Sequence, residues 1–276
     1  MRSAAEKAKA FRALHERDGA FVIPNPWDIG SARMLAHLGF EALATTSAGY
    51  AFSIGQRDNT VGRERMMAHV RQIVAATDLP VNADLENGFG DDPDTVAETL
   101  RMAAAAGLAG CSIEDSTSIS ARDRSPVYEL AAAAERVRAA ADVVRSLPRP
   151  FLLTARAENF VVGRPDLKDT IARLQAYQEA GADVLYAPGL ASKEDIAAVV
   201  GAVDRPVNVL AVGAVAGWSV AELSGLGVKR ISTGSVLARA ALGGFLRAAR
   251  EMREHGTFGF TKDAASSREI AAMLDS

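Results

Sequence analysis

Short apolar segments of β-strand character alternate along the chain with longer segments of helical periodicity. The longer segments are rich in Ala, Leu and Arg, and their apolar residues recur every three or four positions, as in surface helices. Strands separated in this way by helices must pair in parallel. Eight strands are predicted, at residues 20–24, 42–46, 80–85, 110–114, 151–156, 182–187, 206–210 and 229–233. Eight helices are predicted after them, at residues 29–38, 63–76, 93–106, 128–146, 167–180, 193–203, 219–226 and 236–254.

The residues that end the helices support the same division. Gly107, Gly181 and Gly227 each follow an Ala- or Leu-rich run, at the position where a left-handed residue ends a helix. Eight strand–helix units at roughly thirty-residue spacing predict a single (β/α)₈ barrel, a TIM barrel, over about residues 20–255 of the domain 1–276. A doubly wound sheet is the alternative, but it needs a glycine-rich turn after its first strand, where residues 25–28 read Asn-Pro-Trp-Asp. The tail from residue 257 to 276 is predicted to carry an extra helix at 267–274.

Composition narrows the class of protein further. The 276 residues carry a formal net charge of −3 and no basic block, which argues against nucleic acid as the main partner. The single cysteine, Cys111, excludes a disulfide scaffold and a multi-thiolate metal site, and it is expected to be a buried thiol. No apolar run is long enough to cross a membrane, and the first residues lack the apolar core of a signal peptide. We therefore expect a cytoplasmic protein without a membrane partner.

Candidate chemistry lies at the carboxyl ends of the predicted strands, where (β/α)₈ barrels hold their active sites. Asp84 and Glu86 are two residues apart, so an extended strand would point both carboxylates to one face. Glu114 ends the next strand and would complete a group of three. Such a group is costly unless a cation lies within it, and Mg²⁺ suits it because this ion takes few carboxylates and keeps several waters. The alternative is that these are solvated loop carboxylates or helix caps.

Two further features point to anion binding. Arg156 ends the apolar strand 151–156, where its guanidinium could hold a carboxylate or phosphonate in the barrel mouth, or pair with Glu158 or Glu114. The small residues Ser47, Ala48 and Gly49 could offer their amides to an anion. The four histidines show no metal-ligand spacing and are expected on the surface. They are His15, His37, His69 and His255.

In order along the chain, these segments resemble the isocitrate lyase/phosphoenolpyruvate mutase superfamily. The segments that carry the resemblance are Ser47-Ala48-Gly49, Asp58 after Gln56-Arg57, residues 84–90 (DLENGFG), Ile113-Glu114-Asp115 and Ala155-Arg156. The resemblance implies a Mg²⁺-dependent enzyme (Mn²⁺ being an alternative) that acts on a small 2-oxo or 2-hydroxy acid through an enolate-like state. It also implies a homo-oligomer, a dimer or a tetramer.

The resemblance also assigns roles to individual residues. Metal binding is implied for Asp58, Asp84, Glu86 and Glu114, and a catalytic role for Asp58, Glu114 and Arg156. Substrate binding is implied for Ser47, Ala48, Gly49, Arg156 and Asn208, and Trp27 and Tyr50 are expected to line the same pocket.

Departures from the family pattern restrict the reactions that we expect this protein to catalyse. The lyases carry a loop resembling Lys-Lys-Cys-Gly-His after the fourth strand, whereas residues 116–125 contain neither Cys nor His. The mutase's Lys-x-Asn-Ser segment is also missing there, and Glu86 stands where the family usually has Asp. Decarboxylation of an oxaloacetate-like acid needs no such acid, because loss of CO₂ leaves an enolate that a metal stabilises and water protonates. Phosphonopyruvate chemistry by a mutase or hydrolase is the alternative, and a barrel that binds a 2-oxo acid without turnover comes third.

Overall fold

The computed structural model describes residues 2–117 and 126–274 and contains a barrel of eight parallel strands. The hydrogen-bonded order is β1-β8-β7-β6-β5-β4-β3-β2. A backbone bond of 3.0 Å from the amide of Ala44 to the carbonyl of Pro24 joins the two ends of this sheet. The strands are β1 (Phe21–Ile23), β2 (Leu43–Ala44), β3 (Val81–Asp84), β4 (Gly110–Glu114), β5 (Leu152–Arg156), β6 (Val184–Tyr186), β7 (Val207–Leu210) and β8 (Arg230–Ser232). The predicted (β/α)₈ fold is therefore confirmed.

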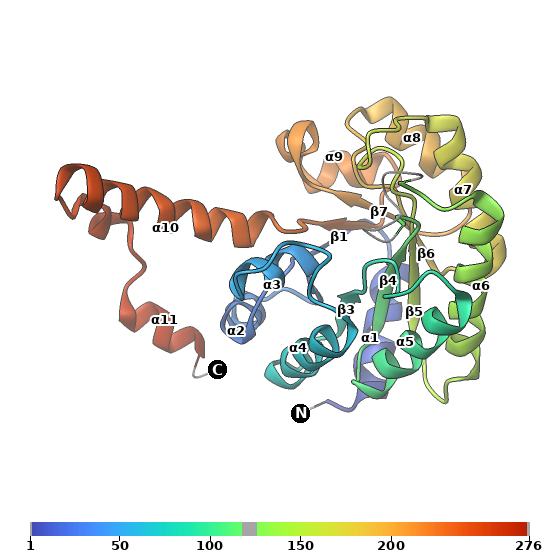
Figure 1. Cartoon of the computed structure of the whole chain (residues 1–276), viewed down its shortest axis with the longest axis horizontal. Coiled ribbons are helices and arrows are strands. Elements are labelled where there is room, and N and C mark those ends of the chain that lie inside the picture. Colours follow the sequence, from blue (N-terminus) through green and yellow to red (C-terminus); the bar gives the residue numbers. More distant parts are fainter. Residues whose placement is uncertain (1, 118–125, 275–276) are drawn as a thin grey trace.

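Helices surround the barrel between consecutive strands (Figure 1). Gly107, Gly181 and Gly227 have positive φ angles of 86°, 110° and 85°, so each predicted helix stop is confirmed as a left-handed residue. The helices after the first five strands are α2 (Ile29–His37), α3 (Ser47–Ser53), α4 (Arg63–Ala76), α5 (Pro93–Ala105), α6 (Leu130–Ser146) and α7 (Leu167–Ala180). They are followed by α8 (Lys193–Ala202), the 3₁₀ helix η2 (Gly213–Gly217), α9 (Val220–Gly225), α10 (Val236–His255), the 3₁₀ helix η3 (Gly259–Asp263) and α11 (Ser267–Leu274).

The amino-terminal helix α1 (Ala4–Glu16) packs against the amino-terminal end of the barrel. Phe11 of α1 is fully buried and belongs to one cluster with Phe21 and Ile23 of β1. His15 lies edge-on to the rings of Phe11 and Phe21 and is only 6% exposed. The expectation that all four histidines lie on the surface is therefore wrong for His15, and also for the buried His69, because both face the core from amphipathic helices. Cys111 is buried, as expected.

The last long helix, α10, departs from the regular pattern of the fold. The pattern predicts that the eighth helix covers the barrel, but α10 projects away from it (Figure 1), and Ala238 is its one buried residue. Leu242, Phe245 and Leu246 are exposed on this helix. The chain then returns, so that α11 lies against α2, where Arg33 donates to the carbonyl of Leu274. Within the described part of the chain, no helix is both long and apolar enough to cross a membrane.

Candidate active site

The carboxyl ends of the strands surround a cavity of about 720 Å³. Its lining includes several of the residues that the sequence singles out: Ser47, Ala48, Asp58, Asp84, Glu114, Arg156 and Asn208. It also includes Glu158 from the loop after β5 and Arg230 from β8. The cavity therefore brings together residues from all eight strands and from the segments that follow them.

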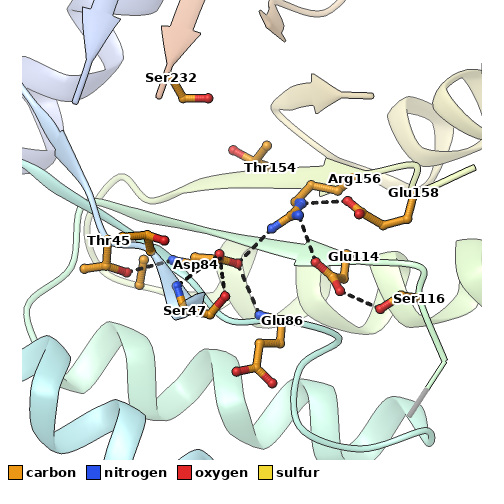
Figure 2. A network of polar contacts seen from close by, with 12 residues as sticks. Thr45, Ser47, Asp84, Glu86, Glu114, Ser116, Thr154, Arg156, Glu158 and Ser232 are labelled. Atoms are coloured by element: carbon orange, nitrogen blue, oxygen red, sulfur yellow. Dashed lines mark hydrogen bonds and ion pairs between the residues drawn. The ribbon is translucent and has the colours of Figure 1, made fainter. Parts of the chain in front are cut away.

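Arg156 is bound to three carboxylates at one side of this cavity (Figure 2). Its Nη1 lies 2.8 Å from Asp84, its Nη2 lies 3.0 Å from Glu114 and its Nε lies 2.9 Å from Glu158. Although burial opposes the charge on Arg156, Glu114, Glu158 and Asp84 together raise its pKa well above the usual range. The ion pairs expected as the alternative role of Arg156 are thus present, and these three contacts use three of its five N–H groups.

Asp84 connects the ion pairs of Arg156 to the residues that follow β2. Its Oδ2 accepts from the backbone amide of Ser47 at 3.4 Å and from the Ser47 hydroxyl at 3.1 Å. Its own amide donates to the hydroxyl of Thr45 at 3.0 Å. The amide of Ser47 at the start of α3 therefore faces a carboxylate of the protein itself. An anion of the substrate at this amide stays a prediction.

Glu114 and Glu158 have raised pKa values because both are buried. Burial raises the pKa of Glu158 to about 8 even with Arg156 beside it. Burial also raises the pKa of Glu114, against the opposing charge of Arg156, and repulsion from Asp84 raises it further. The hydroxyl of Ser116 donates to Glu114. The cavity thus contains, in Glu158, a carboxyl group that can hold a proton close to neutral pH.

Asp115 fixes the position of Glu158 from behind the cavity. Its Oδ1 accepts the backbone amide of Glu158 at 2.8 Å, and its Oδ2 accepts from Arg173 at 3.0 Å and from the hydroxyl of Tyr177 at 2.6 Å. All four residues are buried. This network joins the end of β4 to the loop after β5 and to α7, so the carboxyl of Glu158 has a rigid support.

The oxygen donors at the cavity fit a magnesium ion in their chemistry. Asp58 and Asp84 are both carboxylates that line the cavity, and burial followed by repulsion from Asp84 raises the pKa of Asp58. Across residues 2–117 and 126–274, however, no three His, Cys, Asp or Glu side chains are grouped as ready metal ligands. Mg²⁺ is commonly held by one or two carboxylates and by water, so a site of that kind fits these residues without a closed cage.

Glu86 does not lie where the strand pattern predicts. Its φ angle is +50°, so the extended backbone has ended before it and the two-residue alternation no longer applies. Figure 2 shows its carboxylate pointing away from those of Asp84 and Glu114, and Glu86 is not among the cavity-lining residues. The expectation that Asp84 and Glu86 share one face is therefore wrong.

Three residues expected to bind substrate lie outside the cavity lining. Tyr50 is stacked on His69, with ring centroids 3.8 Å apart and planes at 6°. Gly49 packs so closely against Thr46 and Trp27 that an added Cβ would lie 2.6 Å from a Thr46 methyl. The expectation that Trp27, Gly49 and Tyr50 line the pocket is not met, because these residues pack against other parts of the protein, whereas Ser47 and Ala48 at the start of α3 do line the cavity.

Two cavity residues escaped the sequence-based assignment. The sequence pattern indicates Glu158 only as a partner of Arg156, and it gives Arg230 no role because Arg230 begins the last strand instead of ending it. Asn208 is buried and binds both Arg230 and Ser232, at 2.9 Å in each case. The available signal was the alternation in β8, since Arg230 and Ser232 are two residues apart and must face the same side.

The loop after β4 is described only at its two ends. The amide of Thr117 donates to the carbonyl of Pro126 at 3.0 Å, and Ser116 forms a β-bridge with Val127. The central part of the segment that lacks Cys and His, residues 118–125, lies outside the described residues.

Comparison with known proteins places the chain in a family. A family model described as phosphoenolpyruvate phosphomutase matches residues 11–253. An uncharacterized Mycobacterium tuberculosis protein is 31% identical over 89% of each chain. The 2,3-dimethylmalate lyase of Eubacterium barkeri is 29% identical and covers 68% of this chain and 65% of its own.

Solved structures agree in fold over almost the whole length. A Burkholderia cenocepacia protein provisionally described as a lyase/mutase is 59% identical, with a TM-score of 0.94 and coverage of 99% of this chain and 97% of its own. An oxaloacetate acetylhydrolase solved with oxalate is 28% identical, with a TM-score of 0.84 and coverage of 99% and 94%. The chain therefore belongs to the isocitrate lyase/phosphoenolpyruvate mutase superfamily.

Proposed function

We propose that this protein is a Mg²⁺-dependent carbon–carbon lyase that decarboxylates a small 2-oxo dicarboxylic acid of the oxaloacetate type. The observation that carries the proposal is the cavity in which Arg156 is held between Asp84 and Glu114. This arrangement offers cationic N–H donors and carboxylate oxygens on one wall, as binding a 2-oxo acid and stabilising its enolate requires. Relatives named as lyases and as an oxaloacetate acetylhydrolase support carbon–carbon bond chemistry on such acids.

The side chains around Arg156 would bind the acid and orient it in the cavity. The guanidinium of Arg156 is fixed by Asp84, Glu114 and Glu158, so its remaining N–H groups have a set direction when an acid enters the cavity. Asp84 is itself fixed by Ser47 and Thr45. A rigid polar wall of this kind stabilises developing negative charge without first having to reorganise.

A bound Mg²⁺ ion would add a second positive charge to this side of the cavity. Asp84, Asp58 and Glu114 are the residues that would hold Mg²⁺, directly or through water. When bound, the ion supplies electrostatic stabilisation of the negative oxygen of an enolate.

Proton delivery is the step for which the family's loop acid is missing. In decarboxylation, the bond between C3 and C4 of the substrate breaks, CO₂ departs, and the electron pair forms the enolate of the remaining 2-oxo acid. That enolate then needs one proton at C3. Glu158 lines the cavity, and its pKa of about 8 keeps its carboxyl largely protonated at pH 7. We assign it as the proton donor, with water as the source that replenishes its proton.

A substrate panel tests the reaction. The purified protein is incubated with oxaloacetate, phosphonopyruvate, methylisocitrate and dimethylmalate, with and without Mg²⁺, and the products are followed by NMR. Enzyme-dependent formation of pyruvate from oxaloacetate, above the spontaneous rate and dependent on Mg²⁺, is expected. Turnover of phosphonopyruvate alone would replace the proposal with mutase or hydrolase chemistry, and binding without turnover would leave a binding protein.

A further inference from the structure

A second polar layer lies inside the barrel, beneath the charged network of Arg156. Asn82, Ser112, Asn208 and Arg230 line the cavity, and Thr154 lies in the same layer, in register with Ser112 and bonded to Arg230. Each of the five precedes by two residues another inward-facing position of its strand. All five are buried, with at most 7% of their surface exposed. Barrels of this fold usually fill this region with bulky branched side chains. The polar layer therefore extends the floor of the cavity into the barrel interior.

Arg230 differs from Arg156 in having no acidic partner. Its Nε donates to Asn208 at 2.9 Å and its Nη2 donates to Thr154 at 3.1 Å, and both of these partners are neutral. Its Nη1 is buried and has no hydrogen-bond partner. Arg230 forms no ion pair within 4.0 Å with any residue in 2–117 or 126–274. The guanidinium of Arg156 is thus surrounded by carboxylates, whereas that of Arg230 has no carboxylate partner among the described residues.

The environment of Arg230 favours an anion at this point. Burial, and to a smaller extent the charge of Arg156, lower the pKa of Arg230 to about 10, yet the group remains cationic at neutral pH. A buried charge without a counter-ion is costly unless something compensates it. His15, whose Nε2 is also buried without a partner, is neutral at pH 7 because burial lowers its pKa to about 3. The protein groups around Arg230 therefore supply no negative charge, and a ligand in the cavity can.

We propose that Arg230 is a specificity-determining residue whose guanidinium binds one carboxylate of a dicarboxylic acid in the cavity. The proposal rests on the proposed function and deepens it, because it requires a ligand with two anionic groups instead of one. The Oδ1 of Asn82, which also lines the cavity and is likewise buried without a partner, can accept from a hydroxyl or a water that enters with the ligand.

A pair of stable acids isolates this contact. Malate and lactate share a carboxylate and an α-hydroxyl, and malate adds a second carboxylate. Calorimetry at fixed Mg²⁺ concentration is expected to show malate bound about ten- to a hundredfold more tightly than lactate by the wild-type protein, as for a hydrogen bond between charged groups. In Arg230→Gln this preference is expected to fall to below about threefold, with lactate affinity little changed.

The control is Lys229→Gln, which removes the same charge from the neighbouring residue. Lys229 donates to the carbonyls of Arg17 and Gly19 and does not line the cavity. This variant is expected to keep the full preference for malate. If it loses the preference as Arg230→Gln does, the effect comes from net charge and the subsite is refuted.

The remaining outcomes separate the subsite from the proposed function. Equal affinity of the wild-type protein for malate and lactate refutes the subsite but leaves oxaloacetate turnover in the panel untouched. Binding of neither acid also refutes the subsite, and turnover in the substrate panel then decides the proposed function by itself. If Arg230→Gln does not fold, a crystal structure of the wild-type protein with malate decides. A carboxylate oxygen within about 3.2 Å of Nη1 supports the proposal, and water alone at that position refutes it.

Discussion

Replacing Arg156 by Gln should destabilise the protein in a manner that depends on pH. The substitution keeps a polar side chain but removes the charge that lies between Asp84, Glu114 and Glu158. The side chains of Glu114 and Glu158 are 9% and 3% exposed, so solvent cannot replace the lost partner. Removing one member of a buried ion pair costs about 3–5 kcal/mol, a large part of the ~5–15 kcal/mol that stabilises a typical domain.

The pH dependence follows from the carboxyl groups that remain. Arg156 lowers the pKa of both Glu114 and Glu158, so its removal raises both values further. A carboxyl group whose folded pKa lies above its unfolded value contributes stability below the unfolded value and loses it as the pH rises through the folded value. For Glu158 this window already extends from 4.5 to about 8. The variant should therefore lose stability over the same window and beyond it.

Urea unfolding at pH 5.5 and pH 8.5 measures this difference. We expect a loss of about 3–5 kcal/mol at pH 8.5, but only about 1–3 kcal/mol at pH 5.5, where protonated carboxyl groups need no counter-charge. The control is Arg17→Gln, because Arg17 pairs with Glu41 at 2.7 Å on the surface, with side chains 42% and 54% exposed. That change should cost about 0–1 kcal/mol. A loss for Arg156→Gln that is the same at both pH values would refute the electrostatic account.

Three further predictions concern the metal, the substrate and the assembly. Asp84→Asn should weaken Mg²⁺ binding measured by calorimetry while the fold persists, and unchanged Mg²⁺ affinity in this variant would contradict the site. The Mg²⁺ affinity of the wild-type protein should fall on acidification, because the ligands must be deprotonated. Arg156→Lys keeps the charge but loses the planar fork, so kcat/KM on the substrate found in the panel should fall about ten- to a hundredfold, whereas unchanged kinetics would leave Arg156 a structural role. Light scattering should show that the wild-type protein is a dimer or tetramer, and a wild-type monomer would exclude this assembly. Phe245 is 65% exposed on α10, so Phe245→Glu should shift the assembly toward monomer.

The sequence alone determined the fold and part of the site. Parallel strands with both faces covered require continuous apolar runs, and a glycine after an Ala- or Leu-rich run favours a left-handed helix end, so Gly107, Gly181 and Gly227 marked the units correctly. Asp84, Glu114 and Arg156 were found in the same way, because a polar residue that ends an apolar strand must lie at the barrel mouth. These inferences depend on local periodicity, which the sequence contains in full.

The tertiary structure decided which polar groups face one another. Glu86 turns away from Asp84 because the backbone leaves the extended conformation between them, a change that alternation along a strand cannot anticipate. The three carboxylates around Arg156 come from the ends of β3 and β4 and from the loop after β5, and the isolation of Arg230 depends on neighbours from β5 and β7. The direction of α10 likewise depends on what its apolar face can contact, since its periodicity is the same whether it covers the barrel or leaves it. Contacts between distant segments are set by barrel closure and register, and no local pattern records them.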